Sequence, residues 1–534
     1  MRSECLPVAQ IPHTTQLFSD FVSAYPKVQQ FYPRPPYIQQ WLQDEATKIR
    51  YDNARRQRVA AILRRQNEAW GASGRTLGDI DKLAAGAAAL VTGQQVGLFG
   101  GPAFAIYKAL TAVKLADEAR RNGVDCVPVF WLATEDHDLD EVNQIFLPGP
   151  DGVLQKLTVP VQSNPDAPVG TIAFGPEINA VVEQAAQGIG DSDIVSALRE
   201  SYRAGETFGS AFARLFAKVF AEWGVILLDA SDPELHQVAA PIYRAAIAHA
   251  AELGEALLLR GKELEAAGYH QQVKVTASST VVFALRNGAR VPVHRDGNGF
   301  VIGDERVSLE DLLTRAGSTP RSFSANALFR PVVQDYLLPT LAYTGGPAEV
   351  AYFAQAAVVY EKLLGRVTPI VPRFSATLVE PKPGSLLERY EVSVINVFQG
   401  PEQVREQLAA RALPSELRSG FETAEGSLKK SLTAIRGALE RLDKTLVDAA
   451  ENTESKMLYQ LESLRAKAAR AELRQTEVVG RHAQMLSNSL YPSKNLQERE
   501  IAGVYFLSKY GPGLLGNLYA TMRPDCLDHQ VITV

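Results

Sequence analysis

Cysteine is scarce in this chain, which has three, Cys5, Cys126 and Cys526, among its 534 residues. Cysteines so few and so far apart exclude a framework of disulfide bonds and any zinc site built from cysteine pairs. No run of 18 or more apolar residues occurs, and the N-terminus lacks the apolar segment of a signal peptide. We therefore expect a cytoplasmic protein that does not bind a membrane.

A strong excess of charge of either sign is also absent. The formal net charge is −5, which gives no overall electrostatic reason to bind nucleic acid. Hydrophobic residues make up 46% of the chain and charged residues 22%, as in ordinary globular proteins. The length predicts two or three structural units, and the function must come from local sites.

The most informative stretch is residues 87–114, AAALVTGQQVGLFGGPAFAIYKALTAVK. It predicts a buried strand, a glycine-rich turn, and a helix that begins at Pro102. Free amides at a helix start favour a phosphate or carboxylate, so we interpret the turn as a cofactor site. Its candidate residues are Gln94, Gln95, Gly97, Gly100 and Gly101. Neither common nucleotide fingerprint is present, and Lys108, roughly 9 Å along the helix from Pro102, is a poor phosphate ligand. The alternative is a tight turn whose glycines only allow close packing.

Further buried strands are predicted at residues 126–133, 224–231, 337–346 and 368–378, separated by helical patterns. This alternation predicts an α/β fold with a doubly wound parallel sheet over residues 1–385. β-rich insertions are expected at about 150–222, where short strands between 154 and 175 are followed by helices to about Glu222, and at about 265–320, where Asn-Gly and Asp-Gly turns separate β-branched segments.

A compositional change marks residues 400–487, which are rich in Ala, Leu, Glu, Lys and Arg. Apolar residues recur by fours and threes from Leu428 to Leu446, and again from Met457 after a stutter, which predicts a coiled coil. A helix with such a stripe needs a partner, and we favour a homodimer. The alternative is a helical hairpin within one chain. Residues 488–534 should dock back on the core.

An acidic cluster directly follows the strand at 126–133. Its catalytic candidates are Glu135, Asp136, His137 and Asp138. Ligands of open α/β sheets bind beyond the carboxyl ends of the strands, so the cluster should lie beside the glycine turn if the two strands are neighbours. We interpret His137 as the main proton carrier. No histidine pair has ligand spacing, so no resident metal site is predicted. The alternative is an acidic helix start that the helix dipole stabilises without catalysis.

A second glycine turn, GGPA at residues 345–348, repeats the GGPA of residues 100–103. Glu349 at its helix start would repel phosphate but could hold an amine or hydroxyl groups, so we assign this turn to the substrate. Basic residues near the late strands, Arg330 among them, could bind a carboxylate. The substrate-binding candidates are Tyr343, Gly345, Gly346, Glu349, Arg373, Ser375, Lys494 and Arg499. For the charged ones, a surface salt bridge is the alternative.

Five motifs, TGQQVGLFGGPAFAIYKA, FWLATEDHDLDE, YLLPTLAYTGGPAEVAYFAQ, PRFSATLVEP and KNLQERE, resemble those of the bacillithiol-biosynthesis cysteine ligase family. The resemblance extends over essentially the whole chain. It implies a Rossmann-like core, a coiled-coil dimerisation domain, and a ligase that joins the carboxyl group of cysteine to the amine of glucosaminyl malate. Such a reaction needs an activated carboxyl group, so ATP is the expected cofactor, and magnesium could accompany it. The HIGH and KMSKS signatures of the aminoacyl-adenylate enzymes are absent.

Two other functions fit the same residues. One is a different nucleotide-dependent transferase that acts on a sugar or an amino acid. The other is a non-catalytic, ligand-sensing dimer whose coiled coil transmits binding to a partner. Formation of a thiol product from ATP, cysteine and glucosaminyl malate would separate the ligase from both.

Overall fold

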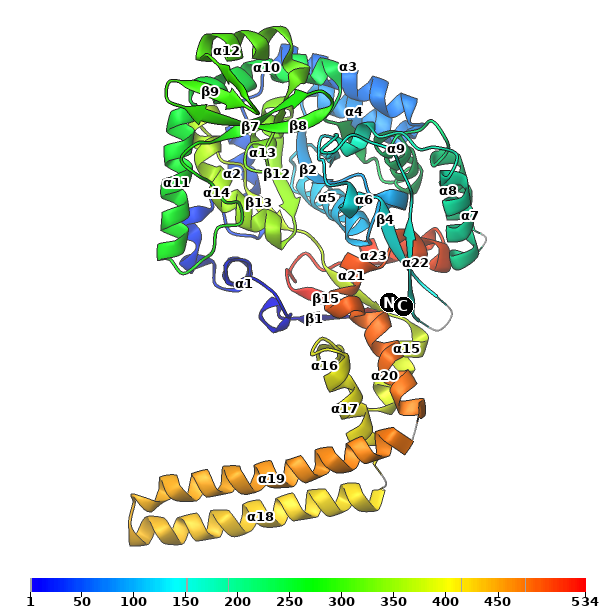
Figure 1. Ribbon diagram of the computed structural model, residues 1–534, viewed down its shortest axis with the longest axis vertical. Coiled ribbons are helices and arrows are strands. Elements are labelled where there is room, and N and C mark those ends of the chain that lie inside the picture. The colour runs from blue at the N-terminus through cyan, green and yellow to red at the C-terminus, as the bar shows by residue number, and fades with distance from the viewer. Residues whose placement is uncertain (1, 150–151, 191, 414, 476) are drawn as a thin grey trace.

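The computed structural model describes residues 2–149, 152–190, 192–413, 415–475 and 477–534. Residues 150, 151, 191, 414 and 476 fall within the predicted insertion and coiled coil, and these positions lie outside the described residues. Most of the chain forms a rounded body, from which a long helical arm projects (Figure 1).

A five-stranded parallel sheet organises the body, with strand order β13-β12-β2-β3-β6. The chain builds outward from β2 through β3 to β6 and then returns to place β12 on the other side of β2. The bounds are β2 Ala88–Gln94, β3 Cys126–Leu132, β6 Ile226–Asp229, β12 Thr340–Gly345 and β13 Ile370–Pro372. The prediction of a doubly wound α/β core is confirmed, and β2 and β3 are neighbours.

Helices cover both faces of this sheet because its strands are apolar on both sides. In β3, Val129 and Trp131 point into one core cluster, and Phe130 and Leu132 into the other. The first cluster includes α3 Asn53–Ala69, α4 Gly74–Ala85, α10 Pro233–Ala248, α13 Arg330–Leu337 and α14 Pro347–Leu364. The second includes α5 Phe104–Arg121 and α9 Phe208–Val219.

Two insertions extend the sheet core. The first carries the hairpin of β4 Gln144–Pro148 and β5 Leu154–Thr158, followed by α7 Ile178–Ile189 and α8 Asp193–Ser201. The second follows α11 Ala250–Ala266 and forms a separate five-stranded antiparallel sheet. This sheet contains β7 Ser279–Arg286, β8 Ala289–Asp296, β9 Gly299–Ile302, β10 Glu305–Val307 and β11 Phe323–Ala325, with α12 Leu309–Ser318 between the last two. The β-rich character of the second insertion is confirmed.

A small third sheet brings the two ends of the chain together. β15 His529–Thr533 lies between β1 Arg2–Leu6, which runs antiparallel to it, and β14 Ala376–Val379, which runs parallel. Cys5 and Cys526 form a disulfide across a sequence separation of 521 residues. This cross-link could not be predicted from the sequence, because nothing local in the chain indicates that its ends meet.

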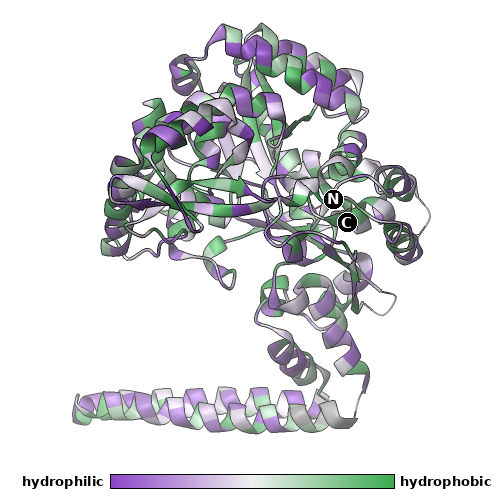
Figure 2. Cartoon of the chain, turned by 45° about the horizontal axis from the view of Figure 1, so that its top comes forward, coloured by the Kyte–Doolittle hydropathy of each residue, from purple (hydrophilic) through white to green (hydrophobic). Residues whose placement is uncertain are grey.

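The arm is an antiparallel hairpin of α18 Ser415–Leu442 and α19 Leu446–Gln475 (Figure 1). It joins the body through α17 Pro401–Ala412 and α20 Glu477–Leu490. The chain reverses at residues 443–445, within the first predicted heptad run, and α18 packs on α19. The predicted stutter between Leu446 and Met457 lies inside the continuous helix α19. Figure 2 shows hydrophilic and hydrophobic residues interspersed along the arm.

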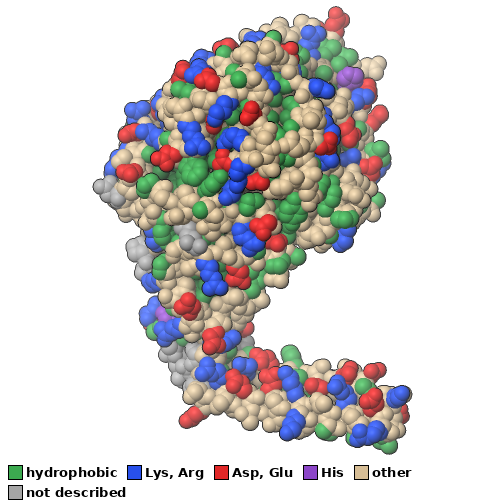
Figure 3. Space-filling model, turned by 180° about the vertical axis from the view of Figure 1, so that it is seen from behind, with side chains coloured by type: hydrophobic (Ala, Val, Ile, Leu, Met, Phe, Trp, Pro, Cys, Tyr) green, Lys and Arg blue, Asp and Glu red, His purple; other side chains and the backbone are tan. Residues whose placement is uncertain are grey.

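After the arm, the chain returns to the body. α20 packs on α15 Pro381–Arg389 and α16 Val394–Val397 in a separate apolar cluster. The segment that follows contains α21 Gln497–Glu500, α22 Gly503–Tyr510 and α23 Gly513–Thr521. Among the described residues, no helix is both long and apolar enough to cross a lipid bilayer. On the face shown in Figure 3, positive and negative side chains are interspersed.

Three local expectations were wrong. Residues 368–378 form two strands in different sheets, β13 and β14, because Arg373 and Phe374 turn the chain out of the main sheet. Residues 169–171 form a short 3-10 helix where a strand was expected. The helix after the glycine turn begins at Phe104, since Pro102 instead forms an isolated bridge with Ala502.

Candidate active site

A cavity of about 360 Å³ opens at the carboxyl end of the parallel sheet, where the strand order changes direction between β2 and β12. Gly93 and Gln94 at the end of β2 and Tyr343 in β12 line it. Open α/β sheets bind their ligands at this position. A Cβ atom on Gly93 would lie 2.7 Å from the Trp131 carbonyl oxygen, so glycine is needed for β2 to lie this close to β3.

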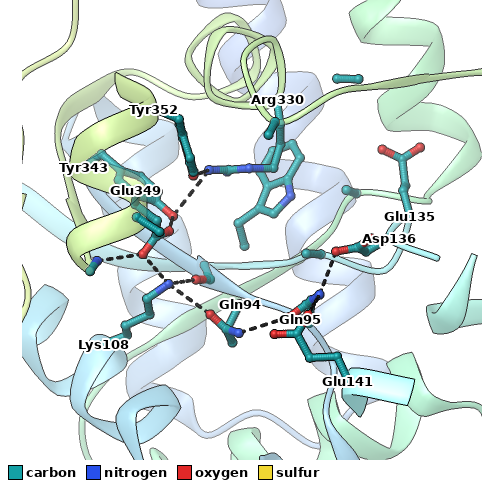
Figure 4. Close-up of a pocket in the computed structure, with 18 of the residues that line it drawn as sticks. Gln94, Gln95, Lys108, Glu135, Asp136, Glu141, Arg330, Tyr343, Glu349 and Tyr352 are labelled. Carbon is teal, nitrogen blue, oxygen red and sulfur yellow. Dashed lines mark hydrogen bonds and ion pairs between the residues drawn. The ribbon is translucent and has the colours of Figure 1, made fainter. Parts of the chain in front are cut away.

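A chain of hydrogen bonds crosses the floor of the cavity (Figure 4). Lys108 Nζ donates to the Gly93 carbonyl at 2.7 Å and to Gln94 Oε1 at 3.0 Å, and Gln94 Nε2 donates to Gln95 Oε1 at 3.3 Å. Gln95 Nε2 then donates to Asp136 Oδ2 and to Glu141 Oε2, both at 2.8 Å. The two glutamines therefore connect a buried cation to a pair of carboxylates.

The cation at one end of this chain is paired with Glu349. Lys108 Nζ lies 2.5 Å from Glu349 Oε2, which also accepts the Gly346 amide at 2.7 Å. Tyr343 donates its hydroxyl to Glu349 Oε1 at 2.5 Å. Burial would raise the pKa of Glu349, but these donors outweigh it and hold that pKa below its ordinary value. Burial lowers the pKa of Lys108 to about 8, against the opposing effect of Glu349.

Arginines form the other basic part of the cavity wall. Arg330 donates to the Tyr352 hydroxyl at 2.9 Å, and Arg373 is bonded to the buried Glu498 at 2.6 Å. The guanidinium of Arg499 also lines the cavity, and the described part of the chain gives it no hydrogen bond or ion pair. Arg499 is therefore the cation most available to an anionic ligand.

The acidic cluster divides between the cavity and a helix start. Glu135, Asp136 and Glu141 line the cavity, as the sequence analysis expected for the first two. Asp138 instead caps α6 Leu139–Val142, where its Oδ1 accepts the amide of Glu141 at 3.1 Å. The helix-start alternative thus holds for Asp138.

His137 does not line this cavity and instead lines a neighbouring one, also of about 360 Å³, between α11 and the antiparallel sheet. Its Nδ1 accepts a hydrogen bond from Arg290 Nη1 at 3.2 Å and lies 3.5 Å from Asp136 Oδ1. Arg290 lines both cavities and also donates to Ser324 and Ala325. His137 thus lies at the boundary of the first cavity, behind Asp136 and Arg290.

The glycine turn is buried, which does not suit the predicted anion site. The Gly101 amide donates to the Leu98 carbonyl at 2.9 Å, and the Gly100 amide contacts both the Gly97 carbonyl and the Tyr202 hydroxyl. Gly97, Gly100 and Gly101 do not line the cavity, and Gly100 packs against Leu215 and Phe216 of α9. The packing alternative therefore describes this turn, and only Gln94 and Gln95 of the predicted cofactor set face the cavity.

The predicted substrate set divides in the same way. Tyr343, Gly346, Glu349, Arg373 and Arg499 line the cavity. The other three candidates lie elsewhere: Gly345 accepts the Arg373 amide through its carbonyl, Ser375 donates to Glu498 at 3.0 Å behind Arg373, and the exposed Lys494 pairs with Glu402 at 3.4 Å.

Several residues that line the cavity were not predicted from the sequence. Lys108 was judged too far along its helix to be a ligand, yet it is a charged residue on an otherwise apolar stretch, FAIYKALTAV, and such a residue is often buried with a partner. Arg290 comes from the second insertion, 153 residues after His137, and nothing local in the sequence places it here.

Comparisons with known proteins cover the whole chain. Two family models match: "Bacillithiol biosynthesis BshC, N-terminal Rossmann-like domain" over residues 1–374, and "Bacillithiol biosynthesis BshC, C-terminal coiled-coil domain" over residues 376–534. A protein of Koribacter versatilis (strain Ellin345) is 49% identical over the full length of both chains. One of Solibacter usitatus (strain Ellin6076) is 37% identical, also over both full lengths. Each is named "Putative cysteine ligase BshC".

The two family models together account for the Rossmann-like body and for the helical arm with its return to the body. The identity to the relatives also extends through both parts without truncation of either chain. The chain therefore belongs to the bacillithiol biosynthesis BshC family.

Proposed function

We propose that this protein is a ligase that joins the carboxyl group of cysteine to the amine of glucosaminyl malate. The relatives that match it from end to end are named cysteine ligases. The observation that supports this chemistry most directly is the convergence of carboxylates and arginines on one cavity. Glu135, Asp136 and Glu141 line the cavity together with Arg330 and Arg499.

Each substrate carries an amino group and one or more carboxylates, so the cavity needs both anionic and cationic side chains. Cysteine brings an ammonium and a carboxylate, and glucosaminyl malate brings an amine and the carboxylates of malate. Arginine binds carboxylates through its planar fork, whereas carboxylate side chains accept hydrogen bonds from an ammonium group. Arg499 would thus bind a carboxylate, and Asp136 and Glu141, which share the Gln95 amide, would bind an ammonium group. Together these side chains would orient the two reactants.

An amide bond does not form from a free carboxylate unless the carboxyl group is activated, and we propose that ATP supplies this activation. The side chains that suit its phosphates are Arg499 and Arg330, because both line the cavity as cations. Magnesium would accompany ATP, although the described residues include no group of three His, Cys, Asp or Glu side chains arranged to hold a metal ion. Orientation of the reactants and handling of the proton are the tasks of the chain itself.

We further propose a homodimer that forms through the arm. Large apolar side chains remain exposed on the hairpin, with Ile435 50%, Leu464 57% and Tyr459 70% exposed. Pairing of α18 with α19 leaves these side chains uncovered, and a second arm could bury them. The proposed substrates are cytoplasmic metabolites, so we expect the protein to work there.

The test is incubation of the purified protein with ATP, cysteine and glucosaminyl malate, followed by mass detection of the thiol product. Omission of each reactant in turn serves as the control, and AMP and ADP are measured in the same samples. We expect product only in the complete mixture. Binding of the compounds without product would contradict the ligase and favour the ligand sensor, and turnover of another acceptor alone would favour a different transferase.

A further inference from the structure

Glu135 lies between the cavity and a buried histidine of α10. Its Oε1 is 3.1 Å from His236 Nε2, and the side chains of Glu135 and His236 are 16% and 5% exposed. Glu135 lines the cavity, whereas His236 does not and lies behind it. The pair therefore places a carboxylate at the cavity wall with an imidazole on its inner side.

The imidazole has few other polar contacts. His236 Nδ1 is buried without a well-formed hydrogen bond among the described residues, although the backbone of Pro320 lies near the ring. Burial would lower the pKa of His236, but Glu135 outweighs it, so that the pKa is raised above the ordinary value. The ring is thus held mainly by one carboxylate.

Charged groups from several elements face this pair. Arg290 on β8 and Arg330 on α13 line the same cavity, and Arg321 from residues 320–322 lies near His236. Asp229 at the end of β6 is the nearby acid, and its Oδ1 accepts the Thr134 hydroxyl at 2.5 Å and the Ser231 amide at 2.9 Å. Burial, with Glu135 nearby, raises the pKa of Asp229.

Glu135 differs from the other acids of the cavity because, among the described residues, the only polar contact of its carboxylate is the one with His236. Asp136 and Glu141 both accept the Gln95 amide, and Glu349 is paired with Lys108. His137, the other candidate base, has its Nδ1 bonded to Arg290. In Figure 4 the Glu135 carboxylate stands apart from the dashed chain of bonds across the floor.

We propose that His236 is a positioning residue that holds the Glu135 carboxylate as the proton acceptor for the attacking amine. This inference rests on the proposed function. The substrate ammonium gives one proton to Glu135, which leaves a neutral amine and a carboxylic acid. The nitrogen lone pair then forms the C–N bond to the cysteine carbonyl carbon of an acyl phosphate or acyl adenylate, and the C–O bond to the leaving group breaks with its electron pair. The new amide nitrogen loses its remaining extra proton to solvent.

The test compares the pH dependence of kcat/KM for the amine substrate in wild type, Glu135→Gln, His236→Gln and His236→Leu. General bases typically contribute roughly 10²- to 10⁴-fold, so we expect Glu135→Gln to lose at least about 10²-fold. Both His236 variants remove the charged partner of the Glu135 carboxylate, so the low-pH limb of the kcat/KM profile should change position in both. Glutamine keeps an N–H donor, so His236→Gln should retain more activity than His236→Leu.

His249→Gln is the matched control, because His249 pairs with Glu252 at 3.2 Å on the exposed surface. Its acidic limb should coincide with that of wild type. A limb that stays in place in both His236 variants, whatever the loss of rate, would overturn the inference and leave the ligase function intact. If the wild-type protein formed no product, the proposed function itself would be refuted.

A second measurement does not depend on turnover. Histidine-selective ¹⁵N labelling follows the eight imidazoles of the chain, and His236→Gln identifies the signal of His236. We expect His236 to titrate above free histidine in wild type and to shift downward in Glu135→Gln. An unshifted titration would show that the two side chains are not coupled and would refute the inference. This titration does not use His236→Leu, so it tests the inference even if that variant fails to fold.

Discussion

Lys108 and Glu349 form an ion pair with an Nζ to Oε2 distance of 2.5 Å, and their side chains are 4% and 14% exposed. The pair connects α5 to α14, the helices that follow the two GGPA turns. The ion pair therefore links the helix that follows β2 to the helix that follows β12, at the wall of the cavity.

Breaking this pair should be costly. Lys108→Met leaves the Glu349 carboxylate buried without its cation, and such losses typically amount to about 3–5 kcal/mol of unfolding free energy. Replacing both partners, as in Lys108→Met with Glu349→Gln, removes the uncompensated charge and should recover part of the loss. Urea unfolding of the two single variants and the double variant measures the coupling; additive effects would contradict it.

The burial of His529 predicts that the free energy of unfolding depends on pH. It is buried between the Ser375 and Thr377 hydroxyls, at 2.7 and 2.8 Å, and burial lowers its pKa to about 4. The unfolded chain binds a proton near pH 6.5, so the free energy of unfolding should fall as the pH drops from 6.5 to 4, by up to about 3 kcal/mol. His529→Gln should flatten this dependence in chemical unfolding measured across that range, whereas the exposed His249→Gln should leave it unchanged.

The glycine turn offers a test of packing against ligand binding. Gly100 has φ +85°, and a Cβ there would lie 3.2 Å from the Phe216 ring. Gly123 has φ +79° with nothing within 4 Å of its Cβ position, so Gly123→Ala carries the backbone strain alone. We expect Gly100→Ala to be less stable than Gly123→Ala by about 1 kcal/mol or more in thermal unfolding. Equal stability, together with weakened ATP binding only in Gly100→Ala, would instead favour a binding loop.

The proposed dimer can be tested at the arm. Ile435→Glu and Leu464→Glu place a charge on apolar side chains that are half exposed within one chain, and should shift sedimentation toward the monomer. Gln460→Glu adds the same charge at an exposed polar position on α19 and should leave the assembly intact. A wild type that sediments as a monomer would refute the dimer.

His137 should matter less than the sequence analysis expected. Because it borders the neighbouring cavity and bonds Arg290, we expect His137→Ala to lower kcat by roughly tenfold or less, well short of the 10²- to 10⁴-fold typical of a general base. The assay is product formation at saturating substrates. A loss as large as that of Glu135→Gln would restore His137 as the proton carrier.

The parallel core could be predicted because its strands are short apolar runs with turn signals, as in β2 and β3, and adjacent parallel strands place Gln94, Gln95 and Asp136 at one edge. The carboxyl-end position of the site follows from the same pattern. The alternative functions of Gly97 and Asp138 could not be separated, since a packed turn and a helix cap use the same residue types as a binding loop and an acidic site.

Contacts between segments that are distant in the sequence could not be predicted, for a different reason. Glu135 and His236 are about one hundred residues apart, and Arg290 reaches the cavity from an insertion with its own sheet. Heptads also cannot reveal whether an apolar stripe faces its own chain, because Leu442 and Leu446 keep a four-residue spacing across the reversal at residues 443–445.

The position of β15 has a consequence for biosynthesis. This strand is made by residues 529–533, yet it sits in the middle of its sheet, with β1 on one side and β14 on the other. During synthesis, neither β1 nor β14 has its partner until residues 529–533 have left the ribosome. The parallel core can assemble earlier, because its last strand in the chain, β13, ends at Pro372.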